Sequence, residues 1–156
     1  MDILVIYDSV FGNTEKIARA IADALGASPA RRVTELQAGE LQGIKLLVVG
    51  SPTRAFSSTP ATKAYLKGLP AGSLAGVRAA VFDTRYTDKS AAKLPSILRT
   101  LAGIFGFAAE KLAKILAKKG ATLVSEPGWF SIDGSEGPLS AGELERAAAW
   151  AGQLRK

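Results

Sequence analysis

Short apolar runs alternate with amphipathic stretches along the whole chain. Five runs have the length and composition of strands, at residues 3–7, 31–36, 44–50, 77–83 and 121–125. Four amphipathic stretches predict helices, at residues 14–25, near 60–69, over much of 91–119 and from Ser140 onwards. Strands and helices that alternate in this way predict one α/β domain over residues 1–156, in which helices cover both faces of a five-stranded parallel sheet.

Two of the predicted elements are less regular than the others. The run at 121–125 can resume as a strand at 129–132, after a Pro-Gly pair. The helix predicted over 91–119 is interrupted by a proline and two glycines. Its apolar part, residues 94–107, is interpreted as an extra helical turn packed on the core, with a lid or docking surface as the alternative.

The last predicted helix has a start signal of its own. Ser140 and Glu143 have the spacing of a capping box, in which each side chain binds a backbone N–H of the first turn. The apolar positions that follow predict a buried face made of Leu144, Ala147, Ala148, Ala151 and Leu154.

The predicted topology places three loops together. Five parallel strands suit the doubly wound order 2-1-3-4-5, and such sheets bind ligands at the carboxyl ends of the strands, where the winding direction reverses. The turns after the first, third and fourth strands then lie side by side, at residues 8–14, 51–60 and 83–90.

The first of these turns has the composition of a phosphate site. A helix start offers unpaired N–H groups and a partial positive charge, and the hydroxyls of Ser9 and Thr14 can add donors. Gly12 permits a close backbone approach, and Asn13 tolerates a tight turn. The turn has neither the lysine of a nucleoside-triphosphate loop nor GxGxxG spacing, so we expect a guest with a single phosphate. The alternative is an ordinary capped turn between strand and helix.

The sequence Ser-Val-Phe-Gly-Asn-Thr at residues 9–14 resembles the phosphate loop of flavodoxins, which bind FMN without a covalent bond. Phe11 stands where that family commonly has a hydroxyl, which removes one side-chain donor and leaves the backbone donors. Flavodoxin-like quinone reductases have an aromatic residue at the same place. The resemblance extends over essentially the whole chain and implies a flavodoxin-like fold.

Two further loops resemble the flavin loops of the same family, at residues 50–56 and 83–86. Arg54 falls where many flavodoxins have a tryptophan, and Tyr86 lies near the position of an aromatic that often stacks on the ring. Asp83 binds either the ribityl chain or nearby loop amides, and the two alternatives remain open. Arg54 and Arg85 would place positive charge near the flavin, which favours its reduced, anionic form.

The resemblance therefore implies one set of cofactor-binding residues, contributed by all three loops. The set is Ser9, Val10, Phe11, Gly12, Asn13, Thr14, Pro52, Thr53, Arg54, Ala55, Phe56, Asp83, Thr84, Arg85 and Tyr86. For residues 53–56 the alternative is a surface loop with one Phe packed on the core, and for Tyr86 it is a half-exposed aromatic at the end of a strand.

Composition excludes several kinds of chemistry. The chain has no Cys and no His, so thiol nucleophiles, Ser-His-Asp catalysis and ordinary zinc sites are excluded, and we expect no metal. The net charge is +6, but many Lys and Arg residues fall at helical spacing, which favours solvated helix faces over nucleic-acid binding. The early apolar run at 3–7 is too short for a signal segment or membrane span, so we expect a cytoplasmic protein.

Three functions are compatible with an FMN site of this kind. We favour an electron-transfer protein that works between a reductase and an acceptor, as a monomer or small homo-oligomer. The alternatives are a small NAD(P)H-dependent quinone or flavin reductase and a flavodoxin-fold binding module without cofactor. In the first two, the flavin supplies the chemistry and the protein supplies position and charge.

Overall fold

A parallel β-sheet forms the centre of the molecule. The structure is a computed structural model and describes all residues except 1, 38, 55–56, 86–106 and 135. Within that part, the strands follow the order β2-β1-β3-β4-β5, and β6 also pairs with β4. They are β1 (Ile3–Tyr7), β2 (Arg31–Arg32), β3 (Leu46–Pro52), β4 (Arg78–Arg85), β5 (Thr122–Leu123) and β6 (Gly128–Ser131). This arrangement confirms the predicted fold class and strand order.

The fifth strand is divided into two short pieces on one edge of β4. β5 pairs with Arg78 and Ala79, and β6 pairs with the other end of β4, from Phe82 to Arg85. The predicted strand at 121–125 is therefore much shorter than expected, and its predicted resumption near residue 129 is confirmed.

The second strand is shorter than its sequence pattern predicts. Only Arg31 and Arg32 pair with β1, and the chain then turns into the 3-10 helix η1 (Val33–Glu35). The prediction of a strand through residue 36 is therefore wrong. The turn buries the Val33 side chain. The free energy gained by this apolar burial replaces that of further hydrogen bonding between β2 and β1.

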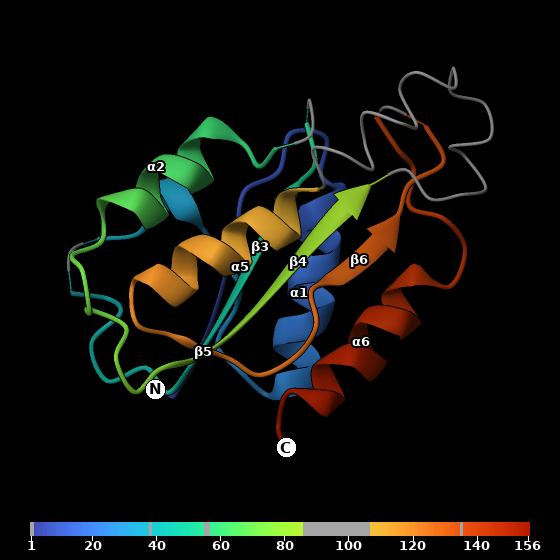
Figure 1. The fold of residues 1–156 in the computed structure, drawn as a ribbon. Coiled ribbons are helices and arrows are strands. Elements are labelled where there is room, and N and C mark those ends of the chain that lie inside the picture. Colours follow the sequence, from blue (N-terminus) through green and yellow to red (C-terminus); the bar gives the residue numbers. More distant parts are fainter. Residues whose placement is uncertain (1, 38, 55–56, 86–106, 135) are drawn as a thin grey trace.

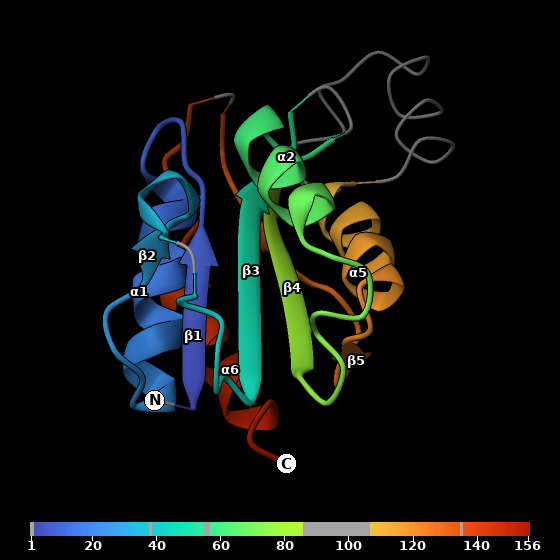
Figure 2. The same ribbon diagram turned by 90° about the vertical axis from the view of Figure 1, so that its left-hand side faces the viewer.

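In the described part of the chain, two helices cover each face of the sheet. α1 (Asn13–Leu25) and α6 (Glu143–Gln153) pack on one face, and α2 (Pro60–Gly68) and α5 (Ala108–Lys118) pack on the other. Figure 1 shows these two layers on opposite sides of the strands, and Figure 2 shows α2 in front of the upper ends of β3 and β4, with α5 beside β4. Of the helix predicted over 91–119, residues 108–118 are observed, and most of the segment 94–107 lies outside the described residues.

Alternate residues of the central strands feed two separate cores. Val5 and Val48 face α1 and α6, whereas Leu47 and Val49 face α2 and α5. This explains the uninterrupted apolar run of β3, because a parallel strand covered on both faces has no solvent side. None of the helices described between residues 2 and 156 is long and apolar enough to cross a membrane.

The start of α6 differs from the predicted capping box. The helix begins at Glu143 after Gly142, which has a left-handed backbone (φ 82°) and no side-chain cap. Instead of binding the amide of Ser140, the Glu143 carboxylate accepts a 2.6 Å hydrogen bond from the N–H of Ser131 in β6. Arg146 donates two further bonds of 2.8 Å to it. Ala147, Ala151 and Leu154 are buried as predicted, but Leu144 and Ala148 are exposed because the helix turns its Glu143 side inward.

Glu143 gives a pH-dependent stability prediction. Burial alone would raise the pKa of Glu143, but the hydrogen bonds from Arg146 and Ser131 outweigh it and lower the pKa below its usual value. The ionised Glu143 carboxylate therefore stabilises the folded state fully above its unfolded-state pKa, about 4.3. This stabilisation is lost as the pH falls through its folded-state pKa. We expect Glu143→Gln to cost about 1–2 kcal/mol in urea unfolding at pH 7, and less as the pH falls below about 4.

The control for this prediction is Glu145→Gln. Glu145 lies in the same helical turn, is exposed, and forms no ion pair with the described residues. A pH-independent cost at Glu143, or an equal cost at both positions, would contradict the prediction.

Candidate cofactor site

The loop between β1 and α1 leaves the start of α1 without a side-chain cap. Gly12 is the N-cap residue, with φ 91°, and makes no capping bond through a side chain. The Ser9 hydroxyl accepts the N–H of Gly12 at 3.0 Å and so shapes the loop itself. The first amides of the helix, those of Asn13 and Thr14, therefore face outward as donors with a partial positive charge.

The two helices on the opposite face are capped. Thr59 accepts a 3.4 Å bond from the N–H of Thr62 at the start of α2. At the start of α5, the Thr53 hydroxyl accepts the N–H of Ala108 (3.0 Å) and the Asp83 carboxylate accepts the N–H of Ala109 (2.9 Å). The start of α1 therefore differs from both in having donors available for a ligand.

A small cavity of about 30 Å³ lies beside the start of α1, at the carboxyl ends of β1, β3 and β4. It has room for only one or two waters. It is lined by Ser9, Val10, Phe11, Asn13, Thr14, Pro52, Thr53, Arg54, Thr84 and Ile132. All of these except Ile132 belong to the predicted set. No carboxylate is among these described lining residues, and Arg54 alone carries a charge, so the donor set suits an anion.

Two buried hydroxyls meet at the cavity. Thr14 Oγ1 and Thr84 Oγ1 lie 2.9 Å apart, one from α1 and one from β4. Each hydroxyl has a single hydrogen to donate. One hydrogen is used in the mutual bond, so the pair keeps one O–H for a ligand.

Two of the side chains that line the cavity, from two different loops, contact each other. The Arg54 guanidinium lies 5.2 Å from the centre of the Phe11 ring, a cation–π contact. Phe11 is 46% exposed. The cavity is far smaller than a typical cofactor pocket of about 300–1,000 Å³, so a flavin ring must lie over its mouth or displace Arg54 from Phe11.

Arg32 fixes the beginning of the loop. One guanidinium nitrogen donates 2.9 Å bonds to the Asp8 carboxylate and to the Ser9 carbonyl. The same Asp8 oxygen accepts the N–H of Ser9. Because these bonds tie the backbone at Ser9 to β2, the loop is held in shape before a ligand arrives.

A segment after β6 also reaches the loop, although no local pattern in the sequence indicates this contact. The Asn13 side chain donates a 2.9 Å bond to the carbonyl of Glu136. Gly137 packs so closely that a Cβ there would lie 2.6 Å from the Asn13 side chain. Ile132 lines the cavity from the same segment. The position of this segment could have been inferred from the predicted topology, because the end of a fifth parallel strand lies on the same edge of the sheet as the other loops.

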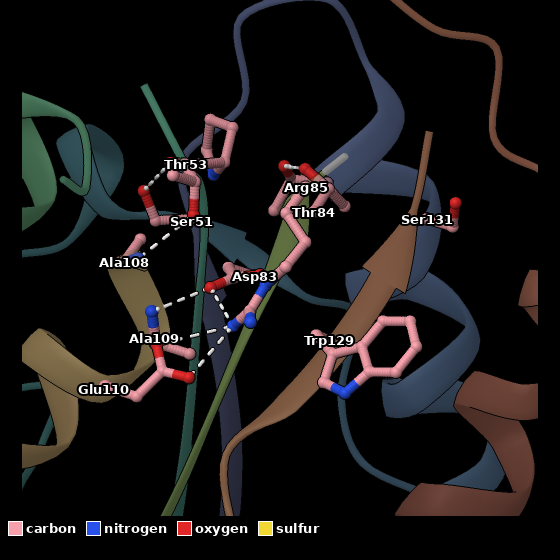
Figure 3. A network of polar contacts seen from close by, with 12 residues as sticks. Ser51, Thr53, Asp83, Thr84, Arg85, Ala108, Ala109, Glu110, Trp129 and Ser131 are labelled. Atoms are coloured by element: carbon pink, nitrogen blue, oxygen red, sulfur yellow. Dashed lines mark hydrogen bonds and ion pairs between the residues drawn. The ribbon is translucent and has the colours of Figure 1, made fainter. Parts of the chain in front are cut away.

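Asp83 and Arg85 are directed toward α5 and not toward the cavity (Figure 3). Arg85 donates two 2.6 Å bonds to the Asp83 carboxylate, which also accepts the N–H of Ala109. Burial raises the pKa of Asp83, and these bonds limit the rise. Asp83 therefore binds an amide of the first turn of α5, and its contact with a ribityl chain stays a prediction. The charge of Arg85 is balanced by Asp83 and Glu110, so Arg85 adds little positive potential at the cavity.

The other predicted residues fall into two groups. Gly12 contributes its backbone conformation and does not line the cavity. Ala55, Phe56 and Tyr86 lie outside the described residues, so their flavin contacts stay predictions.

The fold and the site together define a class: a doubly wound α/β protein with an anion site at the point where the winding reverses. A family model described as flavodoxin matches residues 5–150. The chain therefore belongs to the flavodoxin family, whose members bind FMN, and the uncapped helix start with its hydroxyl donors fits the phosphate of that cofactor.

Solved structures have the same fold at low sequence identity. Oxidised flavodoxin 2 from Bacillus cereus has 23% identity and a TM-score of 0.77, covering 99% of this chain and 98% of its own. A WrbA-like flavodoxin from Agrobacterium tumefaciens has 16% identity and a TM-score of 0.70, covering 98% and 94%. Rubredoxin oxygen:oxidoreductase from Desulfovibrio gigas has 18% identity and a TM-score of 0.67, covering 98% of this chain and 35% of that longer one. A search of curated protein sequences found no match.

Proposed function

We propose that this protein is a cytoplasmic FMN-dependent electron carrier that accepts electrons from a reductase and passes them to an acceptor protein. The observation that supports this proposal best is the uncapped start of α1 beside a cavity whose described lining residues include no acidic side chain. FMN supplies the redox chemistry when bound, and the protein supplies its position and surrounding charge.

The residues of the loop have separate roles in this proposal. The amides of Asn13 and Thr14 and the free hydrogen of the Thr14–Thr84 pair donate to the phosphate. Arg32 and Asp8 keep the backbone of Ser9 in place. Arg54, the charged residue of the cavity lining, lies where it can cover the ring and offset negative charge on the reduced flavin.

A prediction about affinity tests the phosphate site. We expect apo protein to bind FMN at least about tenfold more tightly than riboflavin in calorimetric titration, a difference of about 1.4 kcal/mol. Thr14→Val should lower FMN affinity by about tenfold or more, because a hydrogen bond to a charged group contributes about 1.5–3 kcal/mol, and should leave riboflavin affinity nearly unchanged.

The matched control is Thr84→Val, which breaks the same hydroxyl pair from the β4 side. It should change the FMN-to-riboflavin affinity ratio less than Thr14→Val does. Equal affinity of the wild-type protein for FMN and riboflavin would contradict the phosphate site.

A second measurement separates the carrier from a reductase. The FMN-loaded protein is mixed with NADH or NADPH and a soluble quinone, and the loss of nicotinamide absorbance is followed. A carrier consumes neither nucleotide until a flavodoxin reductase is added. Rapid consumption by the protein alone would show that it is an NAD(P)H-dependent reductase.

A further inference from the structure

Two acidic residues flank the loop that precedes α1. Asp8 comes directly before the loop of residues 9–14, and Glu15 comes directly after it. Their neighbours Ser9 and Thr14 both line the cavity. A phosphate monoester carries about two negative charges at pH 7, so carboxylates at both ends of the loop repel it unless a cation offsets them.

One arginine contacts both carboxylates. Arg32 Nη1 lies 2.9 Å from Asp8 Oδ1, and Arg32 Nη2 lies 3.6 Å from Glu15 Oε2. Glu15 also pairs with Arg19 through its other oxygen. Among the described residues, by contrast, Arg32 is the one basic partner of Asp8. The charge of Asp8 is therefore offset by Arg32.

The end of β2 holds this guanidinium in place. Arg32 pairs in register with Tyr7, the last residue of β1, which comes immediately before Asp8. The guanidinium carbon lies 5.3 Å from the centre of the Tyr7 ring, a cation–π contact. The ring, the two carboxylates and the Ser9 carbonyl surround the guanidinium, so its charge is fixed beside the loop before a ligand arrives.

The charged residue of the cavity lining does not replace Arg32. Arg54 contacts the Phe11 ring and forms no ion pair with any residue that the structure describes. It comes from the loop after β3 and therefore leaves both Asp8 and Glu15 without compensation. Arg32 does not itself line the cavity, so it acts on a ligand through the loop and its flanking charges.

We propose that Arg32 is a positioning residue that makes the site prefer a flavin with a phosphate over one without. Arg32 offsets the negative charge of Asp8 and Glu15 and binds the carbonyl of Ser9, so the phosphate meets donors and little repulsion. This role rests on the proposed FMN site. It concerns the phosphate alone, because riboflavin lacks the charge that the two carboxylates repel.

The test compares the affinities of apo protein for FMN and for riboflavin by calorimetric titration. We expect Arg32→Met to lower FMN affinity by about tenfold and riboflavin affinity by less than about threefold. Arg32→Lys keeps the charge and should keep the FMN-to-riboflavin affinity ratio within about threefold of the wild-type ratio. A wild-type ratio in Arg32→Met would overturn the proposal.

Asp8→Asn separates the effect of charge from that of loop shape. It removes one negative charge and keeps a side-chain oxygen that can accept the N–H of Ser9. We expect Asp8→Asn to bind FMN at least as tightly as the wild type, and Arg32→Met/Asp8→Asn to return within about threefold of wild-type affinity. If Arg32 only shaped the loop, Asp8→Asn would not restore FMN affinity to Arg32→Met, and the proposal would fail.

The single variant Asp8→Asn decides the question even if Arg32→Met does not fold. Its FMN-to-riboflavin affinity ratio should equal or exceed that of the wild type, because it leaves the charge of Arg32 in place and removes a repelling one. A ratio clearly below the wild-type value would overturn the proposal.

The matched control is Arg31→Met, a change at the neighbouring residue of β2. Arg31 Nη1 lies 3.0 Å from Glu40 Oε2, and Arg31 forms no ion pair with Asp8 or Glu15. This variant removes the same net charge as Arg32→Met and should keep the affinity ratio within about twofold of the wild-type ratio. Equal losses in the two variants would show an effect of net charge alone and would overturn the proposal.

The outcome is separable from that of the proposed function. If the wild-type protein binds FMN no more tightly than riboflavin, the phosphate site fails, and the role of Arg32 fails with it. If the wild type prefers FMN and Arg32→Met prefers it equally, the role of Arg32 fails and the phosphate site stands.

Discussion

Replacing Asp83 with alanine is expected to lower the free energy of unfolding by about 3–5 kcal/mol, because it leaves a buried cation without its main partner. The Asp83 side chain is fully buried, and that of Arg85 is 10% exposed. The substitution also leaves the N–H of Ala109, at the start of α5, without its acceptor. Urea unfolding monitored by circular dichroism measures the change.

Two further variants make this prediction specific. Asp2→Ala removes an exposed ion pair with Lys45, 3.5 Å long, and should cost less than about 1 kcal/mol. Asp83→Leu/Arg85→Met replaces the buried pair by apolar side chains and should recover part of the loss. If Asp83→Ala costs no more than Asp2→Ala, the buried pair does not hold α5 in place.

Gly50→Ala is expected to destabilise the protein by about 3 kcal/mol, because β3 has no space for a side chain there. A Cβ at Gly50 would lie 2.0 Å from Cζ of the Phe82 ring and 2.4 Å from both neighbouring ring carbons. Phe82 is fully buried and packs edge-on against Phe130 and Trp150, with ring centres 6.0 and 6.2 Å apart, so its ring cannot easily move away. Thermal or urea unfolding measures the loss.

The control is Gly152→Ala in α6, where an added Cβ would meet no atom within 4 Å. Alanine there should leave stability unchanged or raise it slightly, because alanine favours helix more than glycine does. Gly50→Ala/Phe82→Leu should recover part of the stability, since leucine lacks the outer ring atoms. Wild-type stability of Gly50→Ala would mean that this core repacks freely.

Much of the fold could be predicted from local pattern because burial and periodicity are local signals. The apolar runs at β1 and β3 predict strands, that of β3 a strand covered on both faces, and the alternation of strands and helices predicts the sheet order. The exceptions lie at the sheet edges. There β2 ends at Arg32, and the fifth strand divides into β5 and β6. An edge strand pairs with a neighbour on one side only, so the packing of adjacent loops competes with strand pairing.

In the candidate site too, features formed by residues adjacent in sequence could be predicted, and features that depend on distant partners could not. The turn at 9–14 was predicted because its glycine, its hydroxyls and the following helix are adjacent in sequence. The sequence could not show what Asp83 binds, because the amide that it accepts, that of Ala109, is 26 residues away along the chain. A contact with a bound flavin was an equally good interpretation. Ser140 and Glu143 gave a capping signal that the structure does not use, because the tertiary partners Ser131 and Arg146 bind the carboxylate instead.

The most direct test of the phosphate site is a crystal structure of the protein in complex with FMN. Our account predicts the phosphate within hydrogen-bonding distance of the backbone amides of Asn13 and Thr14, and the ring between the loops that follow β3 and β4. A flavin phosphate bound elsewhere, or the absence of flavin from this cavity in crystals grown with saturating FMN, would contradict it.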